Sequence, residues 1–241
     1  MEQKVEHELK QSAQGNAFKR TAGIAGVVTI LMGIMLAGAF PVSSPEMPEG
    51  FFTPIIAFEF IETKDEIEKL LAWDNAVQRT DLIDAMRFGI KLDYVFMSAY
   101  SLFLGLFCWV CYRISKKRVY LTGVVIAPIV WIADGIENLQ LLNIMSNLLA
   151  EESISFELEF LSIFTWIKWG GIAVIFTVLI PYLWKGGLLS KATSFAATLS
   201  VFSAIIAFVD RSFFNEVLSL SVILVFAGLI FLCFTNSQSD T

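Results

Sequence analysis

Six apolar segments, each about as long as a membrane span, constrain the fold of this 241-residue chain more than any other feature. An α-helix rises about 1.5 Å per residue, so about 20 apolar residues cross the hydrocarbon core of a bilayer, which is about 30 Å thick. The six segments cover residues 21–40, 92–112, 119–140, 160–184, 192–209 and 216–235. They predict an all-α, polytopic bundle of six transmembrane helices, which forms one domain over residues 21–235.

The composition narrows the class of protein further. Hydrophobic residues make up 56% of the chain and charged residues 17%, whereas a soluble domain has about 45–50% and about 25%. This excludes a soluble enzyme, a disordered chain and a disulfide-rich secreted module, and three cysteines cannot form a disulfide framework. The net charge of −6 argues against a nucleic-acid partner, which would require a concentrated basic surface.

With six alternating spans, ten basic residues fall on the side that holds both termini, and basic residues mark the cytoplasmic side. They are Lys4, Lys10, Lys19, Arg20, Arg113, Lys116, Lys117, Arg118, Lys185 and Lys191. The other side receives the segment 41–91, with ten acidic and five basic residues, and the acidic loop 151–159. We therefore expect a bacterial inner-membrane protein with a cytoplasmic leader (1–20), an outer loop (41–91) and a cytoplasmic tail (236–241). A cleaved signal peptide ending at 37–39 is the alternative for the first span.

The outer loop carries signals for structure that does not span the membrane. Residues 51–61 are an apolar run that is too short to span and is interrupted by Glu59. We expect this run to lie at the membrane interface or against the bundle. Thr63 and Glu66 form a capping box, which predicts a helix that starts at Thr63 and has an apolar face through Val77.

A second helix is expected in the same loop. Thr80 or Asp81 can cap it, and its apolar pattern runs into the second span. The whole segment is thus an outer amphipathic helical insert between the first two transmembrane helices. It lies either on lipid or as a lid over the outer end of the bundle, with Trp73, Arg87 and Lys91 as lid residues.

Polar and ionisable residues inside the predicted spans are the most informative positions, because they are costly in lipid and face a bundle interior or a cavity. They are Asp93 and Tyr100 in the second span, Asp134, Glu137 and Asn138 in the third, and Lys168 in the fourth. Helical spacing places the residues of each span on one face. At about 1.5 Å per residue, all of them lie in the outer half of the hydrocarbon core.

We expect Lys168 to form an ion pair with Asp134 or Glu137, with the other polar residues and Glu59 of the loop around this pair. Three or four acids against one lysine leave an excess of negative charge, which requires a proton, water, a basic residue of the loop or a cation. Three interpretations fit this pattern. The residues form a structural ion pair that fixes helix packing, a ligand or ion pocket, or a catalytic site.

Other motifs carry less weight. Cys108 and Cys111 form a C-x-x-C at the cytoplasmic end of the second span, a reducing side, where cysteine is an ordinary apolar residue. His7 has no ligand-spaced partner, so no zinc site is expected, whereas the acids of the third span are a conceivable oxygen site for Mg²⁺ or Ca²⁺. We predict no resident metal and no cofactor. Asp210 and Arg211 are expected to form a solvated pair in a short turn.

Several of these positions together carry a resemblance. The pattern consists of Glu59 within Phe-Glu-Phe, Trp73, Leu92-Asp93-Tyr94-Val95-Phe96 with Tyr100, Asp134-Gly135-Ile136-Glu137-Asn138, and Lys168. It resembles a pattern in a family of small, uncharacterised bacterial multi-pass membrane proteins and covers roughly residues 55–170. The family has no assigned activity, so the resemblance implies a polytopic membrane protein and supplies no mechanism.

Three classes of function fit the sequence. The first is a membrane protein that binds a small solute or lipid in an outer-half polar pocket, as a transporter or transporter subunit. Its architecture is similar to the substrate-binding subunits of vitamin-uptake transporters. The second is an accessory, assembly or immunity-type protein with a purely structural polar cluster and a second copy or another membrane protein as partner. The third is an intramembrane lipid-modifying enzyme that uses carboxylate acid/base chemistry. No sequence motif identifies the protein as an enzyme.

Overall fold

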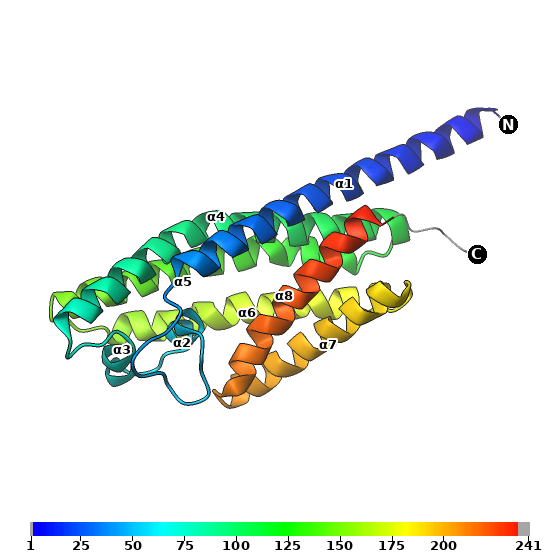
Figure 1. The fold of residues 1–241 in the computed structure, drawn as a ribbon. Helices are drawn as coiled ribbons and strands as arrows, with labels where there is room; N and C mark the ends of the chain where they lie inside the picture. The colour runs from blue at the N-terminus through cyan, green and yellow to red at the C-terminus, as the bar shows by residue number, and fades with distance from the viewer. Residues whose placement is uncertain (1, 236–241) are drawn as a thin grey trace.

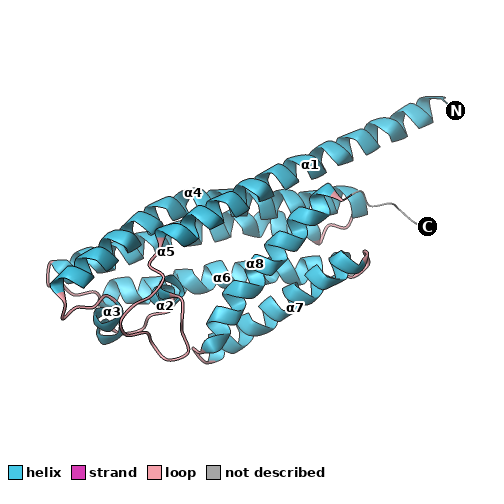
Figure 2. Ribbon diagram, viewed as in Figure 1, coloured by secondary structure: helices cyan, strands magenta, loops and turns pink. Residues whose placement is uncertain are grey.

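The computed structural model describes residues 2–235, with side chains from residue 18 onward, and all regular secondary structure in this range is helical. Figures 1 and 2 show six long helices, which are α1 (Glu2–Ala39), α4 (Ala76–Ser115), α5 (Tyr120–Leu149), α6 (Ser155–Leu183), α7 (Leu188–Val209) and α8 (Phe213–Phe234). Two short helices, α2 (Pro54–Glu59) and α3 (Lys64–Leu70), lie between α1 and α4. The predicted fold is therefore confirmed. The predicted tail 236–241 and the His7 side chain lie outside what the structure describes.

The six long helices close into a ring. Each packs against its neighbour along the chain, α4 packs directly against α1, and α1 also packs against α8. Aromatic side chains fill the middle of this ring. Phe226 of α8 lies 6.0 Å from Tyr100, 5.7 Å from Phe103 and 6.4 Å from Phe176, measured between ring centroids. Polar groups inside such a core must find their partners within the protein.

Unequal helix lengths shape one end of the bundle. With 40 and 30 residues, α4 and α5 are about 60 Å and about 45 Å long, which exceeds a hydrocarbon core of about 30 Å. Their extensions at the start of α4 and at the α5–α6 turn reach beyond the end of α1 and the α7–α8 turn (Figure 1). Residues 40–75, here called the insert, occupy this end, which we call the insert end. The opposite end, with the turns 116–119 and 184–187, is called the basic end.

The apolar run at residues 51–61 packs into the bundle. Phe51, Phe58 and Ile61 are buried, and α2 begins with a proline, which suits the first turn of a helix. Of the two predicted places for this run, the structure shows the one against the bundle. This packing carries Glu59, the last residue of α2, to the interior side of the insert end.

The predicted capping box opens α3. The Thr63 hydroxyl accepts a hydrogen bond from the Glu66 N–H, and the Glu66 carboxylate accepts one from the Thr63 N–H. The predicted apolar face through Val77 is wrong. The helix ends at Leu70, Ala72 takes a φ of 53°, and Val77 is 75% exposed. The chain therefore reverses after α3 instead of continuing as one amphipathic helix.

The helix expected after this reversal is continuous with the second span, as predicted, but it starts earlier. Asn75 is its cap and accepts a hydrogen bond from the Gln78 N–H. The predicted caps Thr80 and Asp81 are wrong, because both already lie within the helix. The Thr80 hydroxyl donates back to a carbonyl of the preceding turn.

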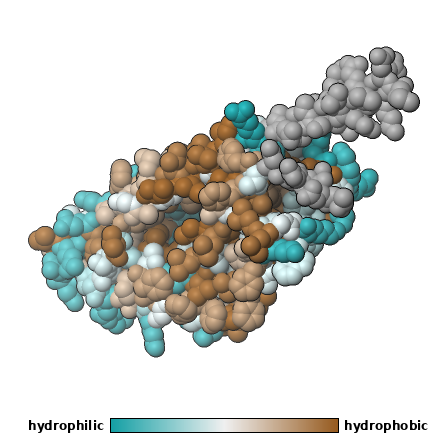
Figure 3. Space-filling view, turned by 45° about the vertical axis from the view of Figure 1, so that its right-hand side comes forward, coloured by the Kyte–Doolittle hydropathy of each residue, from teal (hydrophilic) through white to brown (hydrophobic). Residues whose placement is uncertain are grey.

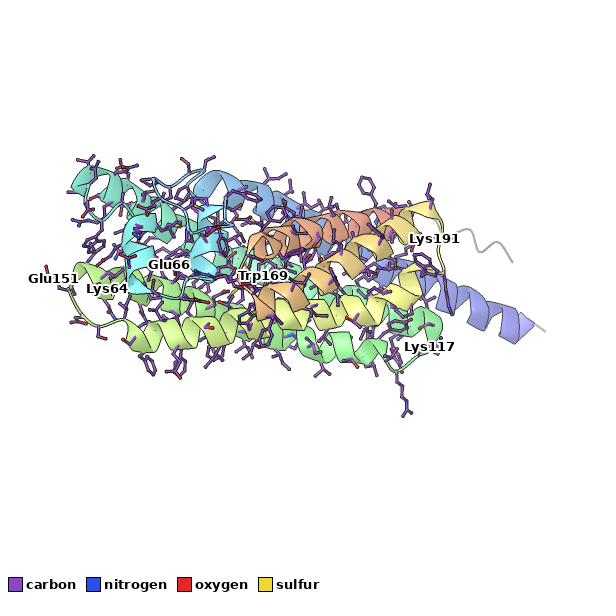
Figure 4. The ribbon with its side chains drawn as sticks, turned by 90° about the horizontal axis from the view of Figure 1, so that it is seen from below. Lys64, Glu66, Lys117, Glu151, Trp169 and Lys191 are labelled. Carbon is purple, nitrogen blue, oxygen red and sulfur yellow. The ribbon has the colours of Figure 1, made fainter. Side chains whose placement is uncertain are left out.

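The surface of the bundle has the character of a membrane protein. In the described part of the chain, six helices are long and apolar enough to cross a membrane, namely Phe18–Ala39 of α1 and all of α4 to α8. Figure 3 shows apolar residues around the middle of the bundle and polar residues toward its ends. In Figure 4, Lys117 and Lys191 lie at the basic end, whereas Glu66 and Glu151 lie toward the opposite end. An apolar belt between charged ends defines an integral membrane protein.

Candidate functional site

Lys168 on α6 lies at the centre of a buried group of charges. Its Nζ lies 2.9 Å from Glu59 Oε2 and 3.5 Å from Asp134 Oδ1, and it also forms an ion pair with Glu137. The four side chains are between 0% and 12% exposed. We call these four residues the ion cluster. Of the two partners considered from the sequence, Lys168 therefore contacts both, and the loop residue Glu59 joins them.

Three helices supply the ion cluster. On α5, Asp134 and Glu137 lie three residues apart and hence on one face, which is turned toward Lys168 of α6. Glu59 arrives from the insert end on α2. Because Phe58 beside it is fully buried, the packing of α2 holds this carboxylate in place.

Two further residues of α6 contact side chains of the ion cluster, and neither was predicted from the sequence to do so. Thr165 Oγ1 lies 2.5 Å from Glu137 Oε1 and 3.2 Å from the Glu59 carbonyl oxygen. Trp169 Nε1 donates to Glu59 Oε2 at 3.0 Å. Thr165 could have been found, because a residue three positions before Lys168 shares its helix face. Trp169 carried no such signal, since its partner comes from a distant part of the chain.

A second group of predicted residues extends from the cluster toward α4. The Tyr100 hydroxyl donates to Asp134 Oδ2 at 2.5 Å, which links α4 to the ion cluster. One turn further along α5, Asn138 Nδ2 donates to Asp93 Oδ2 at 2.6 Å. The structure thus brings all seven predicted cluster residues to one region of the bundle.

The predicted lid residues have no described contact with the ion cluster. Arg87 donates to a hydroxyl on α5, Trp73 lies 4.6 Å from the guanidinium of Arg79, and Lys91 is exposed. Trp73 lies in the turn before α4, whereas Arg87 and Lys91 lie on α4, which is one continuous helix from Ala76. Its first turns therefore extend beyond the bundle beside α5 and do not fold over its end. The part of the insert that covers the ion cluster is α2.

A cavity of about 110 Å³ lies beside the ion cluster at the insert end. Residues of the insert, of α6, of the last turn of α7 and of the α7–α8 turn line it. Glu59 belongs both to the wall of this cavity and to the ion cluster, and Thr165, which contacts Glu137, is also in the wall. A solute in the cavity would therefore lie against side chains that hold Lys168 and its partners.

Arg211 joins the α7–α8 turn to the insert. Its guanidinium forms an ion pair with Glu66, with one hydrogen bond of 3.0 Å, and donates to the Phe60 carbonyl oxygen at 2.9 Å. The predicted solvated pair with Asp210 is wrong, because the start of α3 presents Glu66 to this side chain. Partial burial alone would raise the pKa of Glu66, but hydrogen bonds from Arg211 and from the Glu62 N–H outweigh it and hold this pKa below its ordinary value.

Glu216 in the first turn of α8 holds another part of the insert. Its side chain is almost completely buried and accepts hydrogen bonds from the Phe52 N–H at 3.0 Å and from the Thr53 N–H and hydroxyl, both at 2.8 Å. In the sequence, Glu216 is simply the first residue of the last apolar segment, so nothing there indicates this role. We call the Arg211–Glu66 contact the outer clamp and the Glu216–Thr53 contact the inner clamp.

The carboxylates do not form a metal centre. Within residues 18–235, no group of three or more His, Cys, Asp or Glu side chains is placed to hold a metal ion. The conceivable Mg²⁺ or Ca²⁺ site of the third span is not formed, because the Lys168 ammonium already contacts Asp134 and Glu137. Cys108 and Cys111 are buried free thiols within the core.

Comparisons with known proteins add no family to this description. No protein-family model, no curated protein and no solved structure matches the chain. The resemblance to a family of bacterial multi-pass membrane proteins therefore stays a prediction. The fold and the surface define the class of protein. It is an integral membrane protein with buried ion pairs next to a small cavity.

Proposed function

We propose that the protein binds a small solute at the insert end of its bundle, as a solute-binding or transport protein. The cavity is the entrance to the site, and the ion cluster forms its inner wall. The observation that carries this proposal is that Glu59 and Thr165 both line the cavity. Glu59 is itself a member of the ion cluster, and Thr165 contacts Glu137 of that cluster.

The size of the cavity supports a small ligand. At about 110 Å³, the cavity is smaller than an engineered cavity of about 150 Å³ that binds benzene. Pockets for drug-sized ligands are larger, about 300–1,000 Å³. A small solute or the end of a lipid head group fits this space, whereas an acyl chain does not.

The charge of the cluster supports a role beyond packing. With all groups ionised, three carboxylates against one ammonium give a net charge of −2, whereas a structural pair needs only one acid and one base. Excess acids inside a bundle are costly and mark proton, ion or substrate sites in membrane proteins. In this proposal, protons or a positive group of the solute balance the excess.

Native mass spectrometry of gently extracted protein tests this proposal. The wild type should retain a small molecule, and Thr165→Val should reduce its occupancy at least tenfold. Thr177→Val is the matched control, because its hydroxyl donates only to a carbonyl within α6. Equal occupancy in both variants, or a wild type without any small molecule, would instead favour the accessory class with a structural cluster.

We also propose that the basic end faces the cytoplasm of a bacterial inner membrane and that the insert faces outward, because basic residues mark the cytoplasmic side. Val42 in the insert and Val119 at the basic end are both exposed, and the three native cysteines are buried. A membrane-impermeant thiol reagent on intact cells should label Val42→Cys and leave Val119→Cys unlabelled. The reverse pattern would overturn the proposed orientation.

A further inference from the structure

We infer that the cavity at the insert end binds the ammonium group of a small organic cation, such as a trimethylammonium group. This inference rests on the proposed function above and names the ligand class of the same site. Three features of the cavity carry it, namely its aromatic walls, its acidic side chains and its size.

The aromatic walls come from the insert, α6 and α7. Phe60, Trp166 and Phe208 all line the cavity. The rings of Phe60 and Trp166 lie 5.2 Å apart at an angle of 59°, and those of Trp166 and Phe208 lie 5.0 Å apart at 88°. The three rings therefore form one contiguous aromatic part of the cavity wall. Aromatic faces attract cations, and cages of such rings are the usual way in which proteins recognise quaternary ammonium groups.

The charges in the cavity wall favour a cation. Glu59 and Glu62 both line the cavity. The contacts of Glu59 with Lys168 and Trp169 both use Oε2, so Oε1 of this cavity-lining side chain takes no part in them. Arg211 is also in the wall, but its guanidinium is already engaged by the insert through the outer clamp and lies 4.0 Å from Glu62 Oε1. An anion would therefore meet the Glu59 carboxylate and a guanidinium that is already paired, whereas a cation would meet the Glu59 carboxylate as a partner.

The size and position of the cavity fit a head group. A cavity of about 150 Å³ holds benzene, so a volume of 110 Å³ suits about four to six non-hydrogen atoms, as in a trimethylammonium group. Ser162 and Phe208 in its wall are exposed, so the cavity opens at the surface between α6 and α7. The same ammonium chemistry is available from a free solute and from a lipid head group.

Calorimetric titration of the purified full chain with choline and with its uncharged isostere 3,3-dimethyl-1-butanol tests this inference. Choline should bind at least tenfold more tightly than the isostere. Trp166→Leu should weaken choline binding at least tenfold, because it removes the central ring of the cage. Trp184→Leu is the matched control, since Trp184 is an exposed tryptophan beyond the other end of α6, and it should leave binding unchanged.

The outcomes separate this inference from the proposed function. Equal binding of choline and its isostere, lost in Trp166→Leu, would overturn the ammonium preference and leave the small-solute site standing. Choline binding that Trp166→Leu does not change would overturn the assignment to this cavity. A tenfold weaker choline affinity in nanodiscs of phosphatidylcholine than of phosphatidylglycerol would support a lipid head group as the source, and equal affinities would support a free solute. If choline does not bind, the ammonium inference fails, and if native mass spectrometry also shows no bound solute, both proposals fail.

Discussion

The protein places a positive side chain against carboxylates in two different surroundings. In the ion cluster, Lys168 and its three partners are between 0% and 12% exposed. In the outer clamp, Arg211 and Glu66 are each 23% exposed. The chemistry of the contact is similar, so the surrounding medium makes the main difference. At 4 Å, the attraction between two unit charges is about 1 kcal/mol in water and about 4 kcal/mol at an effective dielectric constant of 20.

The ion cluster and the outer clamp therefore have different consequences for stability when their contacts break. Removing one member of a buried pair leaves an uncompensated charge that water cannot reach. Opening a partly exposed pair allows both groups to become hydrated again, and such pairs contribute about 0–1 kcal/mol. At the insert end, the outer clamp can therefore open at low cost, whereas the contacts of the buried ion cluster cannot.

The largest effect is expected from Lys168→Leu. This change leaves three buried carboxylates without their cation, so the free energy of unfolding should fall by about 3–5 kcal/mol. Thermal or denaturant unfolding in detergent measures this loss. The control is Lys191→Leu at the basic end, an exposed position where the change should stay within about 0.5 kcal/mol.

The double variant Lys168→Leu with Glu137→Leu sharpens the same prediction. Because the second change removes one of the carboxylates left unpaired, it should recover about 1–2 kcal/mol of the loss. Additive losses in the double variant would show that the two side chains are not coupled. The ion cluster would then not differ from the outer clamp in how strongly its charges interact.

An intermediate effect is expected at the inner clamp, where a carboxylate binds three donors. Glu216→Gln replaces one acceptor oxygen by an NH₂ group that faces donors, so the attachment of the insert should weaken by about 1–3 kcal/mol. Hydrogen exchange at the amides of Phe52 and Thr53 measures this loss and should become faster. Glu151→Gln, at an exposed position, is the control. Unchanged exchange in Glu216→Gln would show that packing alone holds the insert.

Much of the inner wall could be predicted from the sequence, because it depends on helical periodicity. Once α5 is a helix, Asp134 and Glu137 must share a face. The cost of charge in lipid then requires a partner at the same depth, and Lys168 lies there. The six spans follow in the same way from the length of their apolar runs.

The cover could not be predicted to the same extent, because its contacts join distant parts of the chain. Arg211 has an acid directly before it in the sequence, yet its partner is Glu66, which lies 145 residues away. Glu216 stands at the start of an apolar run in the sequence, and its burial depends on how the insert folds back. Val77 continued an apolar pattern, but the turn after α3 takes it out of contact. Periodicity describes one element, whereas these contacts depend on how elements meet.

The smallest effect is expected from acid on the outer clamp. Hydrogen bonds from Arg211 and from the backbone hold the pKa of Glu66 below its ordinary value, so the ionised carboxylate stabilises the attached insert above about pH 4.3. This contribution is lost as the pH falls through the lowered pKa. Because the pair is partly exposed, it should amount to at most about 1 kcal/mol.

Hydrogen-exchange protection factors of the amides in α3, corrected for the intrinsic effect of pH, measure this contribution at pH 7 and pH 3. Protection in the wild type should fall severalfold more between these values than protection in Glu66→Gln, which lacks the titrating group. High salt at pH 7 should also lower protection in the wild type, because exposed charges are screened and buried ones much less. An equal fall in both proteins would mean that another carboxylate controls the cover. The inner clamp, with its buried Glu216, would then be the group to change next.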